Sequence, residues 1–294
     1  GKTALSIEFA KKTNGEIVSA DSMQIYKEMN IGTAKPTIEE MQGIKHYLLD
    51  FVEPNERYSV AEYKKDAKNA IRKILEKGKM PIVVGGTGLY IDSLIYEIDY
   101  PEIQIDLKYR KELEEIAEKE GLQKLYEKAK QIDSKAIEKI SPNDKKRILR
   151  ILEIYHETGK TKTELEKNSK SKPEFDYKVF AINMDREILY DRINKRVDIM
   201  ISNGLIEEVE QIYNKYNEFP TSMQALGYKE VVEYLQGKTT KEEMIEKIKQ
   251  ESRRYAKRQL TWFRKNKETI WLDGGSNNID KNIQIILEEI KKSE

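Results

Sequence analysis

Short apolar runs alternate with helix-forming segments through the first hundred residues of the chain. Residues 16–21 (EIVSAD) and 81–84 (PIVV) are runs of strand length without the alternation typical of a strand with one face in water. Residues 3–15 and 59–79 carry apolar side chains at helical spacing, and each segment precedes one of these runs. Buried strands separated by helices indicate a parallel sheet covered on both faces. The sequence therefore predicts an α/β fold.

Segments after residue 100 set the expected domain organisation. Residues 101–170 are mostly helical and highly charged, and the helical stretch at 196–249 interrupts the strand–helix rhythm. We expect a catalytic core of residues 1–195 and 250–294 with an inserted helical subdomain at 196–249. The other expected elements are a helix start at Ser59 and Glu62 (a capping box), a loop at 167–177, strands at 178–183 and 269–273, and helices at 186–216 (broken at Gly204), 237–267 and 278–293.

Composition narrows the function classes. The net charge is +1, so a site for a polyanion has to come from local clustering of basic residues. The chain has no cysteine, which excludes disulfides and thiolate zinc sites, and we expect its two histidines, His46 and His156, to be structural. No apolar run approaches the roughly 20 residues of a membrane span. We expect a cytoplasmic enzyme or binding protein that is monomeric and does not associate with a membrane.

The chain begins with Gly1-Lys2-Thr3 and runs directly into a predicted helix. This is the second half of a phosphate-binding loop, in which backbone N–H groups and the lysine attract phosphate and the threonine hydroxyl binds magnesium. The tripeptide alone is also compatible with chance. The helix and strand that follow favour the loop, so we expect a P-loop NTPase-like core whose loop starts upstream of Gly1.

Polar residues follow the predicted strands. Asp21 follows the first strand, Gly85-Gly86-Thr87 the second, and Asp185 lies just past the third. Ligands of open parallel sheets bind beyond the carboxyl ends of the strands, so we expect these residues on the same edge as Lys2 and Thr3. The alternative for Asp21 is a helix cap, and for the glycines an ordinary tight turn; close approach of a ligand is our interpretation of the glycines.

Several segments resemble a known family. GKT, DSMQIY, IGTAKP, VVGGTGLY, NDKKRILRILEIY, SMQALGYKE and KRQLTWFRKN with WLD occur in the order found in bacterial tRNA dimethylallyltransferases (isopentenyl-tRNA transferases). The resemblance covers essentially the whole chain. It implies transfer of a dimethylallyl group from dimethylallyl diphosphate to N6 of the adenosine 3′ to the anticodon, with Mg²⁺ assisting. The family's full phosphate loop would precede Gly1, which is the one departure.

The resemblance also implies residue roles. Gly1, Lys2 and Thr3 would bind the diphosphate, with Thr3 as metal ligand, and Asp21 (the general base) and Thr87 would be catalytic. The anticodon stem-loop of tRNA would contact Asp21, Ser22, Met23, Gln24, Thr87, Arg110, Lys146, Arg147, Ile148, Leu149, Arg150, Gln224, Gly227, Lys229, Lys257, Arg258, Gln259, Trp262 and Arg264. The largely helical residues 101–170 would face the tRNA.

Independent support for RNA binding is weaker. Residues 251–267 place Arg254, Lys257 and Arg258 along one side of a helix, interleaved with aromatic residues. Such stripes bind phosphates, but in a chain with 36% charged residues a basic face is also an ordinary solvated surface. Two alternatives stay open: a P-loop small-molecule (nucleotide) kinase and a non-catalytic RNA-binding protein.

Overall fold

The structure is a computed structural model, and it describes residues 1–100, 106–167, 171–275 and 278–292. Contacts divide the chain into two compact units. One unit combines Gly1–Asp92 with Phe175–Glu294, and the other is Ser93–Glu174. The division differs from the expected one, because residues 196–249 stay in the unit that holds the strands and residues 93–174 separate.

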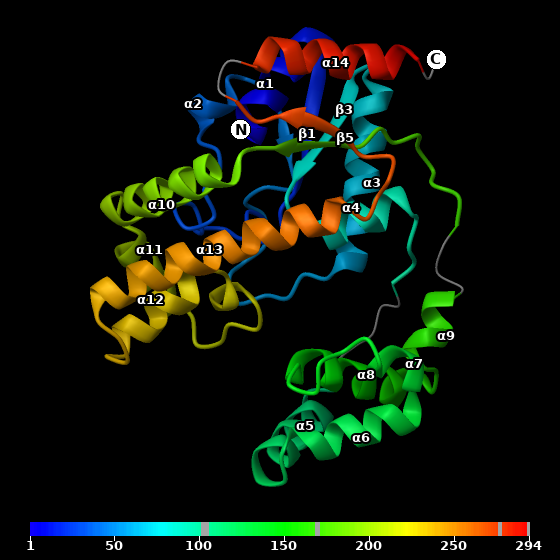
Figure 1. The fold of residues 1–294 in the computed structure, drawn as a ribbon, viewed down its shortest axis with the longest axis vertical. Coiled ribbons are helices and arrows are strands. Elements are labelled where there is room, and N and C mark those ends of the chain that lie inside the picture. Colours follow the sequence, from blue (N-terminus) through cyan, green and yellow to red (C-terminus); the bar gives the residue numbers. More distant parts are fainter. Residues whose placement is uncertain (101–105, 168–170, 276–277, 293–294) are drawn as a thin grey trace. The chain divides into compact units, whose positions relative to one another are not determined.

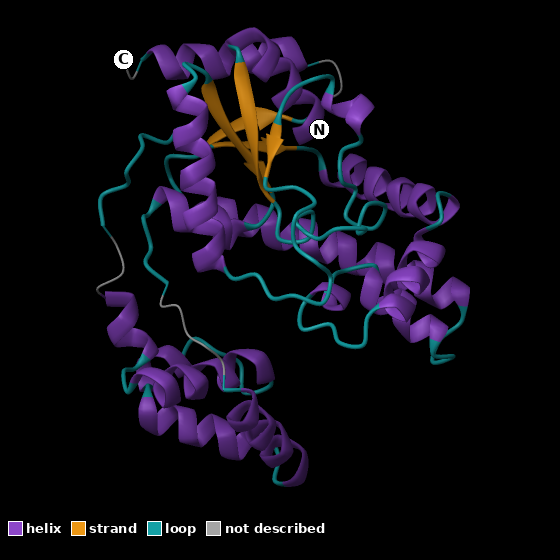
Figure 2. Ribbon diagram, turned by 180° about the vertical axis from the view of Figure 1, so that it is seen from behind, coloured by secondary structure: helices purple, strands orange, loops and turns teal. Residues whose placement is uncertain are grey.

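The first unit contains all the strands described, with helices around them (Figures 1 and 2). Its first part runs α1 (Lys2–Thr13), β1 (Gly15–Ala20), α2 (Ile38–Met41), β2 (His46–Tyr47), α3 (Val60–Glu76), β3 (Met80–Gly85) and the start of α4 (Gly88–Ile95). Its second part runs β4 (Phe180–Asn183), α10 (Arg186–Ser202), α11 (Leu205–Lys215), the 3-10 turn η1 (Ser222–Gln224), α12 (Tyr228–Leu235), α13 (Lys241–Phe263), β5 (Ile270–Asp273) and α14 (Ile279–Lys291).

The strands are parallel, as the sequence predicted. β1 lies between β2 and β3, and its register pairs Val18 with Val83 and Ala20 with Gly85, so β1 and β3 end together. Among the described residues, β4 and β5 form a separate two-stranded parallel sheet instead of joining the first. Side chains of β4 and β5 nevertheless share a hydrophobic cluster with Leu5 of α1 and Ile82 of β3.

Local sequence explains the helices that cover the strands. The predicted capping box at the start of α3 is confirmed, since the Ser59 hydroxyl accepts from the Glu62 N–H while Glu62 accepts from the Ser59 N–H. Gly204 separates α10 from α11 at a φ of 95°, a conformation that residues with a Cβ rarely adopt. None of the described helices is long and apolar enough to cross a bilayer.

A second hydrophobic cluster fixes the segment after β1. Ile25, Tyr26 and Met29 from that segment pack with Leu205 of α11 and Tyr228 of α12, and all five are at most 1% exposed. Burial of such side chains contributes about 1.5–3 kcal/mol each to folding. The helices of residues 196–249 therefore support the polypeptide that directly follows Asp21.

The second unit is helical. It contains the end of α4, α5 (Leu107–Lys119), α6 (Leu122–Ile132), α7 (Ser134–Ile137), α8 (Lys145–Thr158) and α9 (Lys162–Lys167). Leu113, Leu125, Ile148 and Leu152 are among the side chains of its core, and each is at most 1% exposed. The expectation for residues 101–170 is met by these helices, apart from 101–105 and 168–170, which lie outside the described residues.

Candidate active site at the carboxyl ends of β1 and β3

The ends of β1 and β3 are tied together by Thr87. Its backbone N–H donates to the carbonyl of Ala20 at 3.1 Å. Its hydroxyl accepts from the Ser22 N–H at 3.0 Å and donates to the Ser22 hydroxyl at 3.2 Å. Thr87 therefore fixes the backbone on both sides of Asp21.

Asp21 uses one carboxylate oxygen structurally. Its Oδ1 accepts from the N–H of Met23 at 2.9 Å and of Gln24 at 3.2 Å, which caps the turn that follows β1. Among the described residues, Oδ2 accepts no hydrogen bond. Both interpretations of Asp21 thus apply to the same side chain: one oxygen caps the turn and the other is available.

The orientation of the Gln24 amide follows from its partners. Its Nε2 donates to the carbonyls of Thr33 at 3.0 Å and Ala34 at 3.2 Å. Both partners are acceptors only, so the nitrogen has to face them and the oxygen faces away. Within the described part of the chain, that Oε1 has no hydrogen-bond donor. Gln24 therefore offers an acceptor. The neighbouring Met23 packs its side chain against the hydrophobic cluster of α10–α13.

Helix α13 packs one face on the glycine-rich turn after β3. Gln259 donates from Nε2 to the Gly86 carbonyl at 2.9 Å, and Trp262 from Nε1 to Asp92 Oδ2 at 3.0 Å. A Cβ atom on Gly86 would lie 2.1 Å from Gln259 Nε2, and one on Gly88 2.4 Å from Trp262 Cδ1. The glycines admit a close approach, as predicted, but the approaching groups are side chains of α13.

Tyr255 lies one helical turn before Gln259 on the same helix. Burial raises the pKa of the Tyr255 hydroxyl and Asp21 raises it further, whereas hydrogen bonding with Gln259 and Thr87 acts in the opposite direction. These influences place the hydroxyl beside Asp21 and Thr87. The residue is 40% exposed, and the Arg258 guanidinium stands 5.7 Å from its ring centroid. Tyr255 thus presents a partly exposed aromatic surface whose hydroxyl senses the charge of Asp21.

Cations gather at the start of α1. Burial lowers the pKa of the Lys2 amine, Asp21 acts against this, and Arg196 of α10 lowers it further. Burial likewise lowers the pKa of Arg196, with Glu40 and Asp21 opposing. Arg192, one turn before Arg196, lies near enough to lower the pKa at the Gly1 nitrogen, after the effect of burial. Both Lys2 and Arg196 keep solvent-accessible surface.

Lys2, Arg192 and Arg196 form this cation group, and Asp21 acts on the pKa values of two of its members, Lys2 and Arg196. Like charges held together disfavour one another, and an anion placed among them relieves that repulsion. The first turn of α1 adds free backbone N–H groups and the positive end of the helix dipole. The arrangement can bind a phosphate-type anion beside a carboxylate.

Asp185, in contrast, serves as a cap. Its Oδ1 accepts from the N–H of Glu187 at 2.9 Å and of Ile188 at 3.4 Å at the start of α10. The structure gives it no contact with Lys2 or Asp21 among the residues described. The strand-end rule therefore found Asp21 and Thr87 but added Asp185, whose side chain completes a helix instead.

In the helical unit, Glu153 organises two of the predicted RNA-binding arginines. Glu153 is 2% exposed and accepts from Arg110 Nη1 at 2.9 Å, while Arg150 Nη1 lies 3.6 Å from its other oxygen. On the same helix Lys146 and Arg147 are exposed.

Two members of that segment are excluded as side-chain contacts. Ile148 and Leu149 are 0% and 1% exposed and pack in the core of the helical unit. They alternate with the basic residues on α8, so a basic surface and a buried stripe occupy opposite sides of one helix.

The remaining predicted RNA contacts lie on α12, α13 and their flanks. Gln224 is exposed, Gly227 has a φ of 92°, and Lys229 lies 3.3 Å from Glu230 Oε1. On α13, Lys257 and Arg258 are exposed, and Arg264 stands 5.9 Å from the ring centroid of Trp271.

The IPP transferase family model matches residues 24–266, well over half of the chain. The chain belongs to the IPP transferase family. A tRNA dimethylallyltransferase of Caldanaerobacter subterraneus subsp. tengcongensis is 53% identical over 268 residues, which cover 90% of this chain and 85% of that one. One from Acetivibrio thermocellus is 50% identical over 285 residues, covering 96% and 91%.

Solved members of the IPP transferase family share the fold. The full-length tRNA isopentenylpyrophosphate transferase of Bacillus halodurans superposes with a TM-score of 0.73 at 43% identity, covering 99% of this chain and 92% of that one. A eukaryotic dimethylallyltransferase, studied acting on tRNA, gives 0.79 at 32% identity, covering 99% and 76%. The predicted α/β class and family are confirmed.

Sequence reasoning missed two residues of this IPP transferase's candidate site, Arg192 and Arg196. It noted Tyr255 only as an aromatic residue between the basic residues of its helix. The arginines stand four apart in the middle of α10, a spacing that puts both on one face. Tyr255, Gln259 and Trp262 also share a face of α13. Helical periodicity could have grouped the residues in each set, but only the fold shows which face meets α1 and β3.

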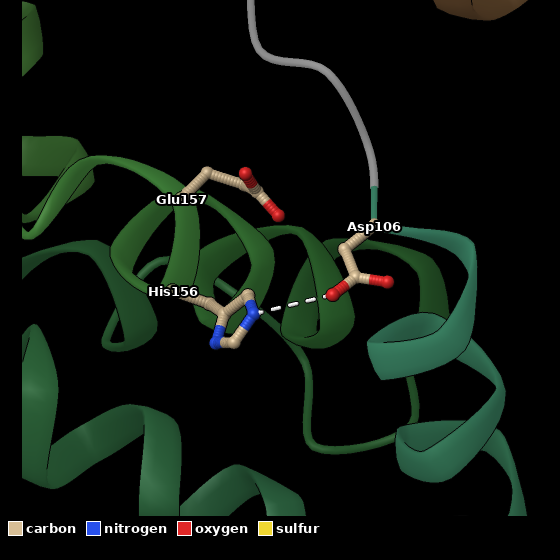
Figure 3. A group of neighbouring side chains, drawn as sticks. All are labelled: Asp106, His156 and Glu157. Atoms are coloured by element: carbon tan, nitrogen blue, oxygen red, sulfur yellow. Dashed lines mark ion pairs between the residues drawn. The ribbon is translucent and has the colours of Figure 1, made fainter.

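A separate cluster in the helical unit has metal-binding residue types (Figure 3). Ligand atoms of Asp106, His156 and Glu157 lie within 4.8 Å of one another, and all three residues are exposed. Asp106 caps α5, its Oδ2 lies 3.5 Å from His156 Nε2, and the His156 ring stacks on Tyr109. Capping, ion pairing and stacking account for the cluster, which agrees with a structural role for His156.

Proposed function

We propose that this chain transfers a dimethylallyl group from dimethylallyl diphosphate to N6 of the adenosine 3′-adjacent to the anticodon of tRNA, releasing diphosphate. The observation that carries the proposal is the packing of α1, which begins at Lys2, on β1, which Asp21 follows. The Asp21 carboxylate also acts on the pKa values of Lys2 and Arg196. Family membership supplies the reaction class. The arrangement of cations and carboxylate offers a binding place for the diphosphate beside a base that can accept a proton.

The cation group and the first turn of α1 bind the diphosphate of the donor. As the bond between C1 of the allyl group and the diphosphate oxygen breaks, negative charge grows on the leaving group, and fixed cations stabilise it. The allylic carbon shares the developing positive charge. N6 of adenine attacks that carbon and forms the new C–N bond.

Asp21 takes the proton that N6 loses. The N6 lone pair is delocalised into the purine ring, so the amine is a weak nucleophile and a base that accepts its proton assists the attack. The available Oδ2 suits this step, because Oδ1 is held by the turn. Gln24 Oε1, an acceptor with its amide nitrogen engaged elsewhere, suits the second N6 proton.

The target adenine has to leave its stack to reach Asp21. The exposed ring of Tyr255 offers a surface on which an unstacked base can lie, as aromatic residues do in recognition of single-stranded RNA. Basic side chains on α5, α8, α12 and α13 and directly after α13 would bind phosphates around the anticodon loop. They are Arg110, Lys146, Arg147, Arg150, Lys229, Lys257, Arg258 and Arg264.

Magnesium fits the donor chemistry at the start of α1. The Thr3 hydroxyl in the first turn and the oxygens of a diphosphate are the hard oxygen ligands that Mg²⁺ prefers. Thr3 would hold the ion, which when bound neutralises charge on the diphosphate. We propose that the protein acts as a monomer in the cytoplasm, where its tRNA substrate is found.

Nucleoside mass spectrometry of tRNA incubated with the protein and dimethylallyl diphosphate tests the proposal. We expect N6-dimethylallyladenosine at the position 3′ to the anticodon, with diphosphate released only when tRNA is present. Unmodified tRNA accompanied by tight tRNA binding would instead support a non-catalytic RNA-binding protein, and phosphate transfer from ATP would support a kinase.

A further inference from the structure

We propose that Glu208 is a positioning residue for the target base, because it holds residues 30–34 in the conformation that turns the Gln24 amide oxygen away from the protein. The inference rests on the proposed function, in which Gln24 Oε1 accepts a proton of the adenine N6. Glu208 lies on α11, among residues that the sequence assigned to an inserted helical subdomain.

The Glu208 carboxylate gathers four donors. Oε2 accepts from the backbone N–H of Asn30 at 3.0 Å and of Ile31 at 2.8 Å. Oε1 accepts from the N–H of Gly32 at 3.2 Å and from the Tyr228 hydroxyl at 2.5 Å. Three consecutive backbone N–H groups that converge on one anion form a nest, and hydrogen bonds to a charged acceptor are stronger than neutral ones.

The bound loop has little freedom at its centre. A Cβ atom on Gly32 would lie 2.4 Å from Cε2 of Tyr228, so only glycine fits between the loop and α12. Two residues later, Ala34 adopts a φ of 49°, a left-handed conformation that costs free energy for a residue with a Cβ. Such a conformation persists where surrounding contacts impose it. The Ala34 N–H donates to the carbonyl of Ile31 at 3.0 Å, and Ile31 is one of the residues whose N–H Glu208 binds.

The strained residue is the one that orients Gln24. The carbonyls of Thr33 and Ala34 accept the two hydrogen bonds of the Gln24 amide nitrogen. If the loop relaxes, those carbonyls turn, and the Gln24 amide loses the partners that distinguish its nitrogen from its oxygen. Gln24 would then offer a donor as readily as an acceptor, and adenine would lose its advantage over a purine that carries an oxygen at C6.

Glu208 acts through the loop and not on the substrate. Its two oxygens are occupied by the four donors described, and none of these donors belongs to the cation group, Asp21 or Tyr255. The charge of Glu208 therefore stabilises the backbone conformation of residues 30–32. A defect confined to base discrimination separates this role from catalysis.

The test compares binding of two anticodon stem-loop RNAs, one with adenosine and one with inosine at the target position. Inosine carries O6 in place of the amine, so it presents an acceptor to Gln24 Oε1. We expect the unsubstituted protein to prefer adenosine and Glu208→Gln to reduce that preference by about tenfold, the change that loss of one typical hydrogen bond produces. Glu208→Asp keeps the charge but shortens the reach, and we expect an intermediate preference.

Glu210→Gln is the matched control, because Glu210 is an exposed residue on the same helix. It should leave the preference for adenosine over inosine unchanged. Thermal unfolding of each variant shows whether a changed preference comes from a loss of folding stability. Gln24→Ala should reduce the preference as Glu208→Gln does, and the double variant should add nothing further, since coupled residues are not additive.

The outcomes separate two failures. A Gln24→Ala protein that still prefers adenosine would remove Gln24 from base recognition, and with it this part of the proposed function. In the other failure, Gln24→Ala reduces the preference for adenosine, but Glu208→Gln and Glu208→Asp keep it in full. That result would overturn only the role of Glu208.

Discussion

The Asp21 carboxylate caps the turn after β1 and is the proposed general base, and substitutions can separate these two roles. Asparagine keeps an oxygen that accepts the two N–H bonds of the turn but cannot accept a proton. We expect Asp21→Asn to lower single-turnover prenyl transfer by about 10²–10⁴-fold, the usual contribution of a general base, with tRNA affinity within about twofold. Asp21→Ala should in addition lose about 1 kcal/mol of stability with the cap.

Asp185→Asn is the control for this substitution, because Asp185 also follows a strand and also accepts two backbone N–H bonds. It should retain full activity. A large loss of tRNA affinity in Asp21→Asn would assign Asp21 to RNA binding in place of the base role.

Cations at the start of α1 should act on the prenyl donor and not on the RNA. Lys2→Ala and Arg196→Ala each remove one charge from the group that would hold the diphosphate, and we expect KM for dimethylallyl diphosphate to rise by about tenfold, the loss of one charge-assisted hydrogen bond. The measurement is steady-state kinetics with donor varied at saturating tRNA. Lys195→Ala is the control, since Lys195 is an exposed lysine of the same helix that pairs with Asp191. Equal KM values in all three variants would contradict the site.

Helix α13 combines two functions along one element. Its inner face packs Gln259 and Trp262 on the turn after β3, while Arg254, Lys257 and Arg258 stay exposed. Phosphate contacts release counterions, so the slope of log K against log salt reports their number.

Replacing Arg254 and Lys257 by glutamine should therefore reduce the magnitude of the salt slope of tRNA binding by about 1.4–1.8, which corresponds to two phosphates. Replacing Lys281 and Lys291 of α14, two exposed lysines far along the chain, makes the same change in net charge. The slope should then stay as it was. If both pairs change the slope equally, α13 is an ordinary solvated surface.

Elements were more predictable than their contacts. The capping box of α3, the apolar runs of β1 and β3 and the break at Gly204 are local signals, and the structure confirms them. The strand-end rule located Asp21, because parallel strands end at one edge. It also selected Asp185, whose side chain caps α10, because the rule does not distinguish a capping aspartate from a functional one.

Contacts between distant segments lay beyond sequence reasoning. Arg196 meets Lys2, and Glu208 meets Ile31, only because α10 and α11 fold back onto the start of the chain. Burial of Ile148 and Leu149 was readable from their spacing on α8, yet motif matching had counted them as RNA contacts.

At the scale of the whole molecule, Glu16 should make the free energy of unfolding depend on pH in the acidic range. Glu16 is 4% exposed and accepts from Lys77, Lys79 and Tyr47. Burial alone would raise the pKa of Glu16, but these hydrogen bonds outweigh burial and lower it from 4.5 to about 2. A depressed pKa stabilises the folded state above the unfolded value, and that stability is lost as the pH falls from about 4.5 to about 2.

Urea unfolding of Glu16→Gln at several pH values measures this contribution. We expect a loss of about 2 kcal/mol near pH 7, from weakened charged hydrogen bonds, and a smaller difference from the unsubstituted protein as the pH falls below about 4.5. Glu8→Gln, on the exposed side of α1, should show no such convergence. A difference that is constant with pH would mean that the charge of Glu16 is not involved.

The crowding of positive groups beside α1 also bears on how a catalytic cycle ends. Freed diphosphate is a stronger anion than the ester it came from, because cleavage leaves an additional acidic oxygen. We therefore expect the cation group to bind free diphosphate more tightly than dimethylallyl diphosphate. We expect release of diphosphate to limit turnover, and added inorganic pyrophosphate to slow the enzyme by competing with the allylic donor.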